Sequence, residues 1–88
     1  MIGQFVTSKA GHDKGTLYVV VAEEGDFVFL SDGRLKTCDA PKKKRRRHIQ
    51  PVNRKVEDAL LLRLVNGEAV RNEEIKHAIA HYSKNENQ

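Results

Sequence analysis

Short apolar runs separated by turn-forming residues occupy the first half of the chain. Residues 17–21 and 27–30 consist of leucine, β-branched and aromatic residues, and runs of this length and composition are typical of strands. Between them, residues 24–26 read Glu-Gly-Asp, and a glycine at that place permits the backbone of a tight turn. The pattern therefore predicts a central β-hairpin.

Three further strands are expected around this hairpin. A first strand contains Val6, and Asp32-Gly33 is a strong hairpin signal before a fourth strand at residues 34–37. A short fifth strand falls at residues 48–51. Five short strands joined by tight turns predict a mainly β fold built on a small barrel, because closure removes the exposed strand edges.

After the fifth strand the apolar period changes from two to 3.6. Residues 56–65 are mostly apolar and predict a first helix, with Asn53 as its N-cap and Gly67 at its end. Asn72 is a good N-cap for a second helix, whose apolar residues have the spacing i, i+3, i+4 and i+7. That apolar face consists of Ile75, Ala78, Ile79 and Tyr82.

The pattern divides the chain into two parts. Residues 1–52 are expected to form the barrel, including a basic loop at residues 41–47, and residues 53–88 a C-terminal helical hairpin. After Pro41 this loop contains no apolar residue, so it cannot pack and is predicted to be solvated.

The formal net charge is only +4, but the basic residues are concentrated. Residues 42–55 contain eight Lys and Arg and no acidic residue, whereas the rest of the chain has eight basic against twelve acidic residues. Any affinity for a polyanion must therefore be local. The basic residues of the segment are Lys42, Lys43, Lys44, Arg45, Arg46, Arg47, Arg54 and Lys55.

A basic run of this kind can be a nuclear-localisation signal, a solubilising loop, an acidic-membrane patch or a nucleic-acid contact. No amphipathic apolar face accompanies it, which argues against the membrane. Arginine pairs bidentately with phosphate, and a flexible run can follow an RNA groove and become ordered on contact. RNA is therefore the ligand that we favour.

There is no Trp and few aromatic residues, so we expect recognition of RNA backbone and shape more than of a base sequence.

A glycine-bracketed segment at residues 9–15 is the second basic feature. Gly11 and Gly15 permit positive φ and close approach of the backbone, so an anion could bind the exposed amides. The alternative is a tight β-turn with solvated lysines, and Asp13 lowers the positive potential there. The candidate RNA-binding residues of this loop are Lys9, Gly11, His12 and Lys14.

These features resemble the KOW motif. The resemblance rests on residues 3–15 (GQFVTSKAGHDKG) followed by 17–21 (LYVVV), and it continues through Asp32-Gly33 and the basic stretch to residues 48–51 (HIQP). More narrowly, the chain is similar to bacterial KOW-domain RNA-binding proteins that are themselves similar to the L-fourteen-e family of large-subunit ribosomal proteins.

The resemblance implies an SH3-like barrel, RNA binding and association with the ribosome. It also implies that the loop between the first two strands and the basic segment face RNA. The glycine of the motif falls on Gly11, and its flanking basic positions fall on Lys9 and Lys14. The two helices are not part of the motif, so nothing transfers to them.

Catalytic chemistry is not visible in the sequence. An 88-residue chain offers little room for a converging pocket with a nucleophile, a base and an orienting group. His77 and His81 are four residues apart on one helix face, but no third ligand is near them. The single cysteine, Cys38, excludes an internal disulfide and has no activating context. We expect no enzyme activity, no metal and no cofactor.

The sequence thus predicts a binding module for RNA, with ribosomal RNA and ribosomal proteins as its partners. The rival hypothesis is a protein-interaction adaptor, because SH3-like barrels also bind peptides and the helices offer a partner surface.

The first residues lack the features of a signal peptide, and the longest apolar run is far below the roughly 20 residues of a membrane helix. We therefore expect a cytoplasmic protein with neither a membrane nor a small-molecule partner.

Overall fold

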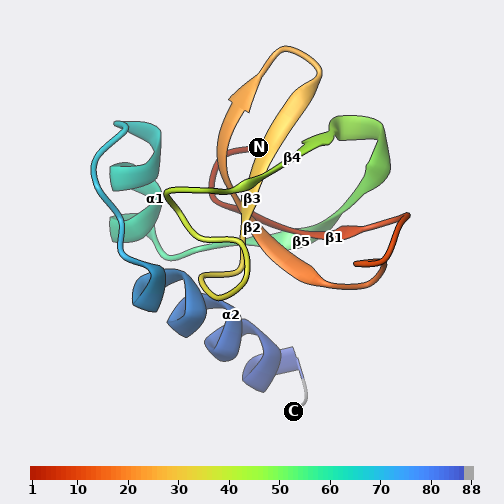
Figure 1. The fold of residues 1–88 in the computed structure, drawn as a ribbon. Helices are drawn as coiled ribbons and strands as arrows, with labels where there is room; N and C mark the ends of the chain where they lie inside the picture. Colours follow the sequence, from red (N-terminus) through yellow and green to blue (C-terminus); the bar gives the residue numbers. More distant parts are fainter. Residues whose placement is uncertain (87–88) are drawn as a thin grey trace.

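The computed structural model describes residues 1–86, and a five-stranded antiparallel sheet is its main element (Figure 1). The strands are β1 (Gln4–Ser8), β2 (Leu17–Glu24), β3 (Phe27–Ser31), β4 (Lys42–Arg45) and β5 (Ile49–Lys55). A 3₁₀ turn, η1 (Arg46–His48), precedes β5, and the helices α1 (Asp58–Val65) and α2 (Asn72–Glu86) follow it. Residues 87 and 88, which the sequence assigned to the helical extension, lie outside the described residues.

The strand order is β4-β3-β2-β1-β5, so β4 and β5 are the two edges of the sheet. The sheet is not closed into a barrel, although the chain passes directly from one edge to the other through η1. The expected five strands and two C-terminal helices are confirmed. The mainly β description is corrected, because the two helices make the protein a mixed α/β domain.

Strand alternation divides the apolar residues between two cores, one on each face of the sheet. Neighbouring residues such as Phe5 and Val6 point to opposite faces and belong to different cores. The helices cover one face, where Phe5 and Val19 pack with Leu60, Leu64 and Ile75. The other core consists of Val6, Tyr18, Val20, Val28, Leu30 and Ile49.

The predicted hairpin between β2 and β3 is confirmed, with Gly25 and Asp26 in its turn. The fourth strand lies later than predicted. Residues 34–37 form no strand, because the carboxylate of Asp32 accepts hydrogen bonds from the backbone N–H groups of Arg34 and Lys36 and folds the chain into a compact loop. At the tip of this loop Leu35 is 87% exposed.

The expected solvated loop at residues 41–47 is also wrong. Lys42–Arg45 is β4, which pairs with β3 in the register Phe27↔Arg45 and Leu30↔Lys42, and η1 follows it. Pairing with β3 satisfies the backbone of β4, so the strand needs no apolar side chains of its own.

Both helices were predicted, but the first begins later than expected. Asn53 lies in β5, which continues to Lys55, and Glu57 is the N-cap of α1. The start of α2 at Asn72 is confirmed. Its predicted apolar face is confirmed too, because Ile75 is fully buried and Ala78, Ile79 and Tyr82 pack against the same core.

Candidate nucleic-acid interface

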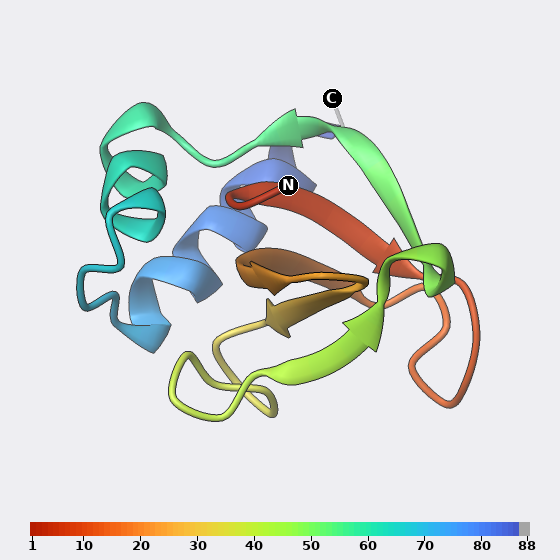
Figure 2. The ribbon, with the colours of Figure 1, turned by 90° about the horizontal axis from the view of Figure 1, so that it is seen from above.

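The β1–β2 loop and η1 lie side by side at the end of the sheet opposite α1 (Figures 1 and 2). The backbone N–H of Lys9 donates a hydrogen bond to the carbonyl oxygen of His48 over 2.8 Å, and Ser8 pairs with Ile49. The structure thus joins the two basic regions that the sequence singled out. The four RNA-binding candidates of this loop are all exposed there, namely Lys9, Gly11, His12 and Lys14.

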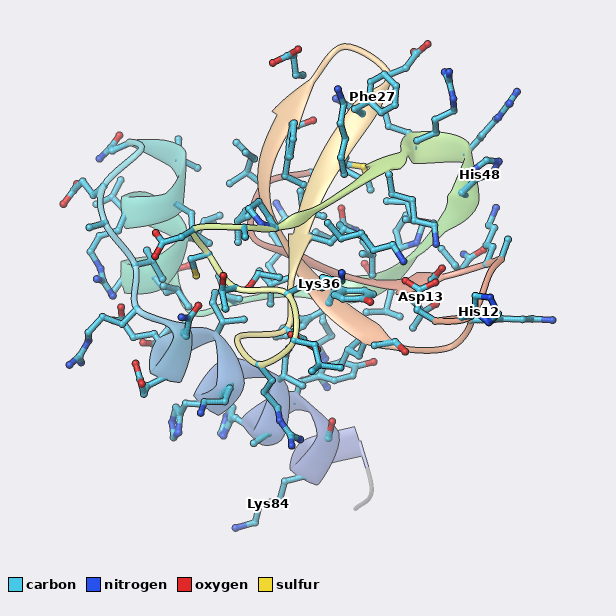
Figure 3. All side chains as sticks on the ribbon, viewed as in Figure 1. His12, Asp13, Phe27, Lys36, His48 and Lys84 are labelled. Atoms are coloured by element: carbon cyan, nitrogen blue, oxygen red, sulfur yellow. The ribbon has the colours of Figure 1, made fainter. Side chains whose placement is uncertain are left out.

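The loop turns at Gly11, whose φ of 88° is a left-handed conformation that side chains disfavour. Figure 3 shows His12 at the outer end of the loop and Asp13 nearer the sheet. The exposed residues of the loop are therefore held outward, while one acidic residue faces the protein.

Asp13 connects the loop to β4. Its carboxylate accepts hydrogen bonds from Lys42 Nζ over 2.7 Å and from Lys44 Nζ over 3.0 Å. The hydroxyls of Ser8 and Tyr18 donate to the same carboxylate, each over 3.0 Å. Since the Asp13 side chain is only 13% exposed, these contacts lie in a region partly shielded from water.

Burial and hydrogen bonds together shift the pKa values of Asp13 and Tyr18. Burial raises the pKa of Asp13, but hydrogen bonds from Lys42, Lys44, Ser8 and Tyr18 outweigh burial and hold that pKa well below its usual range. Burial and the hydrogen bond to Asp13 raise the pKa of the Tyr18 hydroxyl. Asp13 is therefore a carboxylate, and Tyr18 a neutral donor, throughout the physiological pH range.

β4 divides the basic run into two sets, because successive side chains of a strand point to opposite faces. Lys42 and Lys44 face Asp13, and their side chains are 31% and 11% exposed. Lys44 Nζ also donates to the Ala10 carbonyl oxygen over 3.0 Å and contacts the Ser8 hydroxyl. These two lysines are neutralised in part by the protein itself, so less of their charge is available to an external ligand.

Lys43 and Arg45 point to the other face. Lys43 Nζ lies 4.3 Å from the centroid of the Phe27 ring, and the Arg45 guanidinium carbon lies 4.9 Å from the same centroid. Both residues are exposed, and neither forms an ion pair within residues 1–86. Their charges are therefore available to an external anion.

The two arginines of η1 differ in the same way. Arg46 forms an ion pair with Glu23 over 2.7 Å and donates to the Gly25 carbonyl oxygen. Together with the N-terminal ammonium group, this arginine holds the pKa of Glu23 at about 2. Arg47 is exposed and has no carboxylate partner in the described part of the chain. Arg46 therefore stabilises the fold, whereas the charge of Arg47 is available to an external ligand.

The remaining predicted site residues, Arg54 and Lys55, lie elsewhere. They end β5, which at about 3.3 Å per residue extends about 20 Å from η1. There they line a cavity of about 320 Å³ together with Phe5, His77, His81 and Tyr82. The structure therefore does not bring Arg54 and Lys55 together with the basic run.

The described residues contain neither a cluster of metal ligands nor a membrane-spanning helix. Between Met1 and Glu86, no three His, Cys, Asp or Glu side chains converge as ligands for one ion. The rings of His77 and His81 stack with centroids 6.4 Å apart. Neither α1 nor α2 has the length and apolar content to cross a bilayer.

Sequence reasoning missed two features of this surface. It treated Asp13 as a local weakness, whereas this residue organises the loop, and it did not place Phe27 beside the basic run. The periodicity of β3 could have indicated the second feature, because Val28 and Leu30 alternate with Phe27 and Phe29 and only one of these pairs can face a given core.

No protein-family model matches the chain, and no curated protein matches it either. The geometry of this surface and the resemblance to the KOW motif are therefore what points to a function.

Proposed function

We propose that this protein is a non-enzymatic binding protein for structured RNA, with ribosomal RNA as its ligand. The single observation that carries the proposal is a set of exposed basic side chains on β4, on η1 and in the adjacent β1–β2 loop that form no ion pair within the described residues. They are Lys9, Lys14, Lys43, Arg45 and Arg47.

The proposal includes the KOW motif, an SH3-like architecture and association with the ribosome. The strand order β4-β3-β2-β1-β5 and the 3₁₀ turn between the edge strands support an SH3-like arrangement, even though the sheet is open. The exposed turn at Gly11, flanked by Lys9 and Lys14, supports the proposed role of the motif loop.

Phosphate neutralisation gives the proposal a measurable consequence. If the five basic side chains contact about five phosphates, the log-log slope of affinity against salt is about −3.5 to −4.5. The variant K43Q/R45Q/R47Q removes three of these charges. We expect its slope to become shallower by about 2 to 3 and its affinity for a structured ribosomal RNA fragment to fall, measured by fluorescence anisotropy at several salt concentrations.

The matched control is R34Q/R71Q/K76Q, which removes one Lys and two Arg from exposed positions away from the proposed interface. Equal loss of affinity in both triple variants would show that only net charge matters. Unchanged affinity of K43Q/R45Q/R47Q would refute the proposed interface.

An adaptor function is the second candidate, and one observation favours it. Leu62 and Val65 on α1 are 60% and 58% exposed, which places apolar side chains on the surface of a helix. A protein partner that binds this face would be insensitive to salt and to K43Q/R45Q/R47Q, but sensitive to L62S/V65S. Binding with that profile, and no affinity for RNA, would replace the first proposal with the second.

A further inference from the structure

On the sheet face opposite Val28 and Leu30, which the helices cover in part, β3 carries two aromatic rings that belong to neither core cluster. Phe27 and Phe29 are half-buried and belong to neither apolar cluster, whereas Val28 and Leu30, between and beyond them, are fully buried on the other face. Figure 3 shows Phe27 at the β2–β3 hairpin end of the sheet, far from Lys84 on α2. Phe27 therefore lies away from α2, beside the exposed residues Lys43 and Arg45.

The cross-strand register places a cation opposite each ring. Arg45 is the partner of Phe27 and Lys43 the partner of Phe29. Lys43 Nζ also lies 6.0 Å from the Phe29 centroid, in addition to its closer approach to Phe27. Two positive charges therefore lie above one aromatic surface and lack carboxylate partners within the described residues.

We propose that the patch of Phe27, Lys43 and Arg45 binds an unpaired nucleotide of the RNA, with its base stacked on the Phe27 ring and its phosphate on the two cations. The inference rests on the proposed function and narrows the ligand to RNA with a single-stranded nucleotide beside a duplex. Stacking on an aromatic ring needs a base whose face is free, and paired bases within a duplex do not offer one.

Charge and shape agree with this ligand. A base has a flat apolar face and an adjacent phosphate, and the patch has a ring with two cations over it, which a phosphate can attract away from the ring when a base stacks there. The Arg45 guanidinium can also stack on a base or bind phosphate bidentately. The ladder between β3 and β4 holds the ring and the cations next to each other, so only the ends of the Lys43 and Arg45 side chains must move when the nucleotide binds.

The experiment compares two RNA ligands on the full chain: a short duplex with a single-stranded overhang, and the same duplex with blunt ends. We expect the parent protein to prefer the overhang, and Phe27→Leu to weaken overhang binding about tenfold while leaving blunt-duplex binding unchanged. Phe27→Tyr keeps the ring and should retain the preference. The salt slope should not change in either variant, because no charge is removed.

A 2-aminopurine in the overhang gives a readout that does not depend on a variant. Stacking quenches its fluorescence, so quenching on addition of the parent protein supports the proposal, and binding without quenching refutes it. Equal affinity of the parent for both RNA ligands would overturn the inference and leave the proposed function in place. Failure to bind either RNA would overturn both.

Discussion

Asp13 shows how one residue can determine the geometry of an interface. It accepts hydrogen bonds from the side chains of Ser8, Tyr18, Lys42 and Lys44, and so connects β1, β2 and β4 through the loop. Strand alternation points Lys42 and Lys44 toward Asp13, and the negative charge of Asp13 holds their ammonium groups there. Because Lys42 and Lys44 pair with Asp13, the charges of β4 that remain available to a ligand are those of Lys43 and Arg45.

The residue-scale prediction concerns Asp13→Asn. The amide cannot balance two partly buried lysine charges, so we expect the free energy of unfolding to fall by about 2–3 kcal/mol, measured by urea denaturation. Asp39→Asn makes the same charge change at an exposed position and should leave stability nearly unchanged. Equal stability of the two variants would show that the network contributes nothing to the fold.

Gly33 gives a second prediction at this scale. Its φ is 74°, and a Cβ atom there would overlap the backbone carbonyl oxygen of Asn72 at the start of α2. Gly25 has a φ of 57° but open space around the missing Cβ. We expect Gly25→Ala to cost about 1–2 kcal/mol through backbone strain alone, and Gly33→Ala at least 1 kcal/mol more, measured by thermal unfolding. Equal costs would mean that the loop moves away from α2 without penalty.

At the scale of elements, β4 marks the limit of what the sequence could predict. Six consecutive Lys and Arg residues lack the apolar alternation by which strands are recognised, so the run resembled a solvated loop. Its strand conformation depends on Asp13, which is 29 residues from Lys42 in the chain, and on the aromatic rings of β3. The local pattern of apolar and polar residues cannot reveal the contacts of β4 with Asp13 or with the rings of β3. By contrast, α2 and the β2–β3 hairpin were predictable, because turn chemistry and spacing specify them locally.

The ion pair between Arg63 and Glu74 joins the two helices, and it makes their packing dependent on pH. Hydrogen bonds from Arg63 and from the Arg71 backbone hold the pKa of Glu74 at about 2, below its usual 4.5. A lowered pKa means that the pair stabilises the folded state above about pH 4.5, and that this stabilisation is lost as the pH falls toward 2.

We therefore expect Glu74→Gln to lower the melting temperature at pH 7 and to make it less dependent on pH between 4.5 and 2, measured by thermal unfolding across that range. Glu73→Gln is the matched control, because Glu73 is exposed on the same turn of α2 and has no ion pair within the described residues. If both variants follow the parent curve, the ion pair does not couple the helices.

At the scale of the whole molecule, the sequence indicated the kinds of element and the basic character of the surface, but not how the two parts combine. A division at residue 52 suggests a barrel with an appendage. In the structure, β5 continues to Lys55, and Leu60, Leu64 and Ile75 cover an apolar face of the sheet that would otherwise contact water. Which face of a strand meets which helix is a long-range choice that alternation alone leaves open.

Ile75 tests whether the two parts fold as one unit. It is fully buried between α2 and the sheet, so Ile75→Ala should cost about 2–5 kcal/mol, whereas Leu62→Ala, at a 60% exposed position, should cost far less. If unfolding is cooperative, Ile75→Ala will speed native-state hydrogen exchange at Val20, in the opposite core, by the same factor as in α2. Faster exchange confined to α2 would instead show that the helix opens alone, and that the sheet with the proposed RNA-binding face is stable without it.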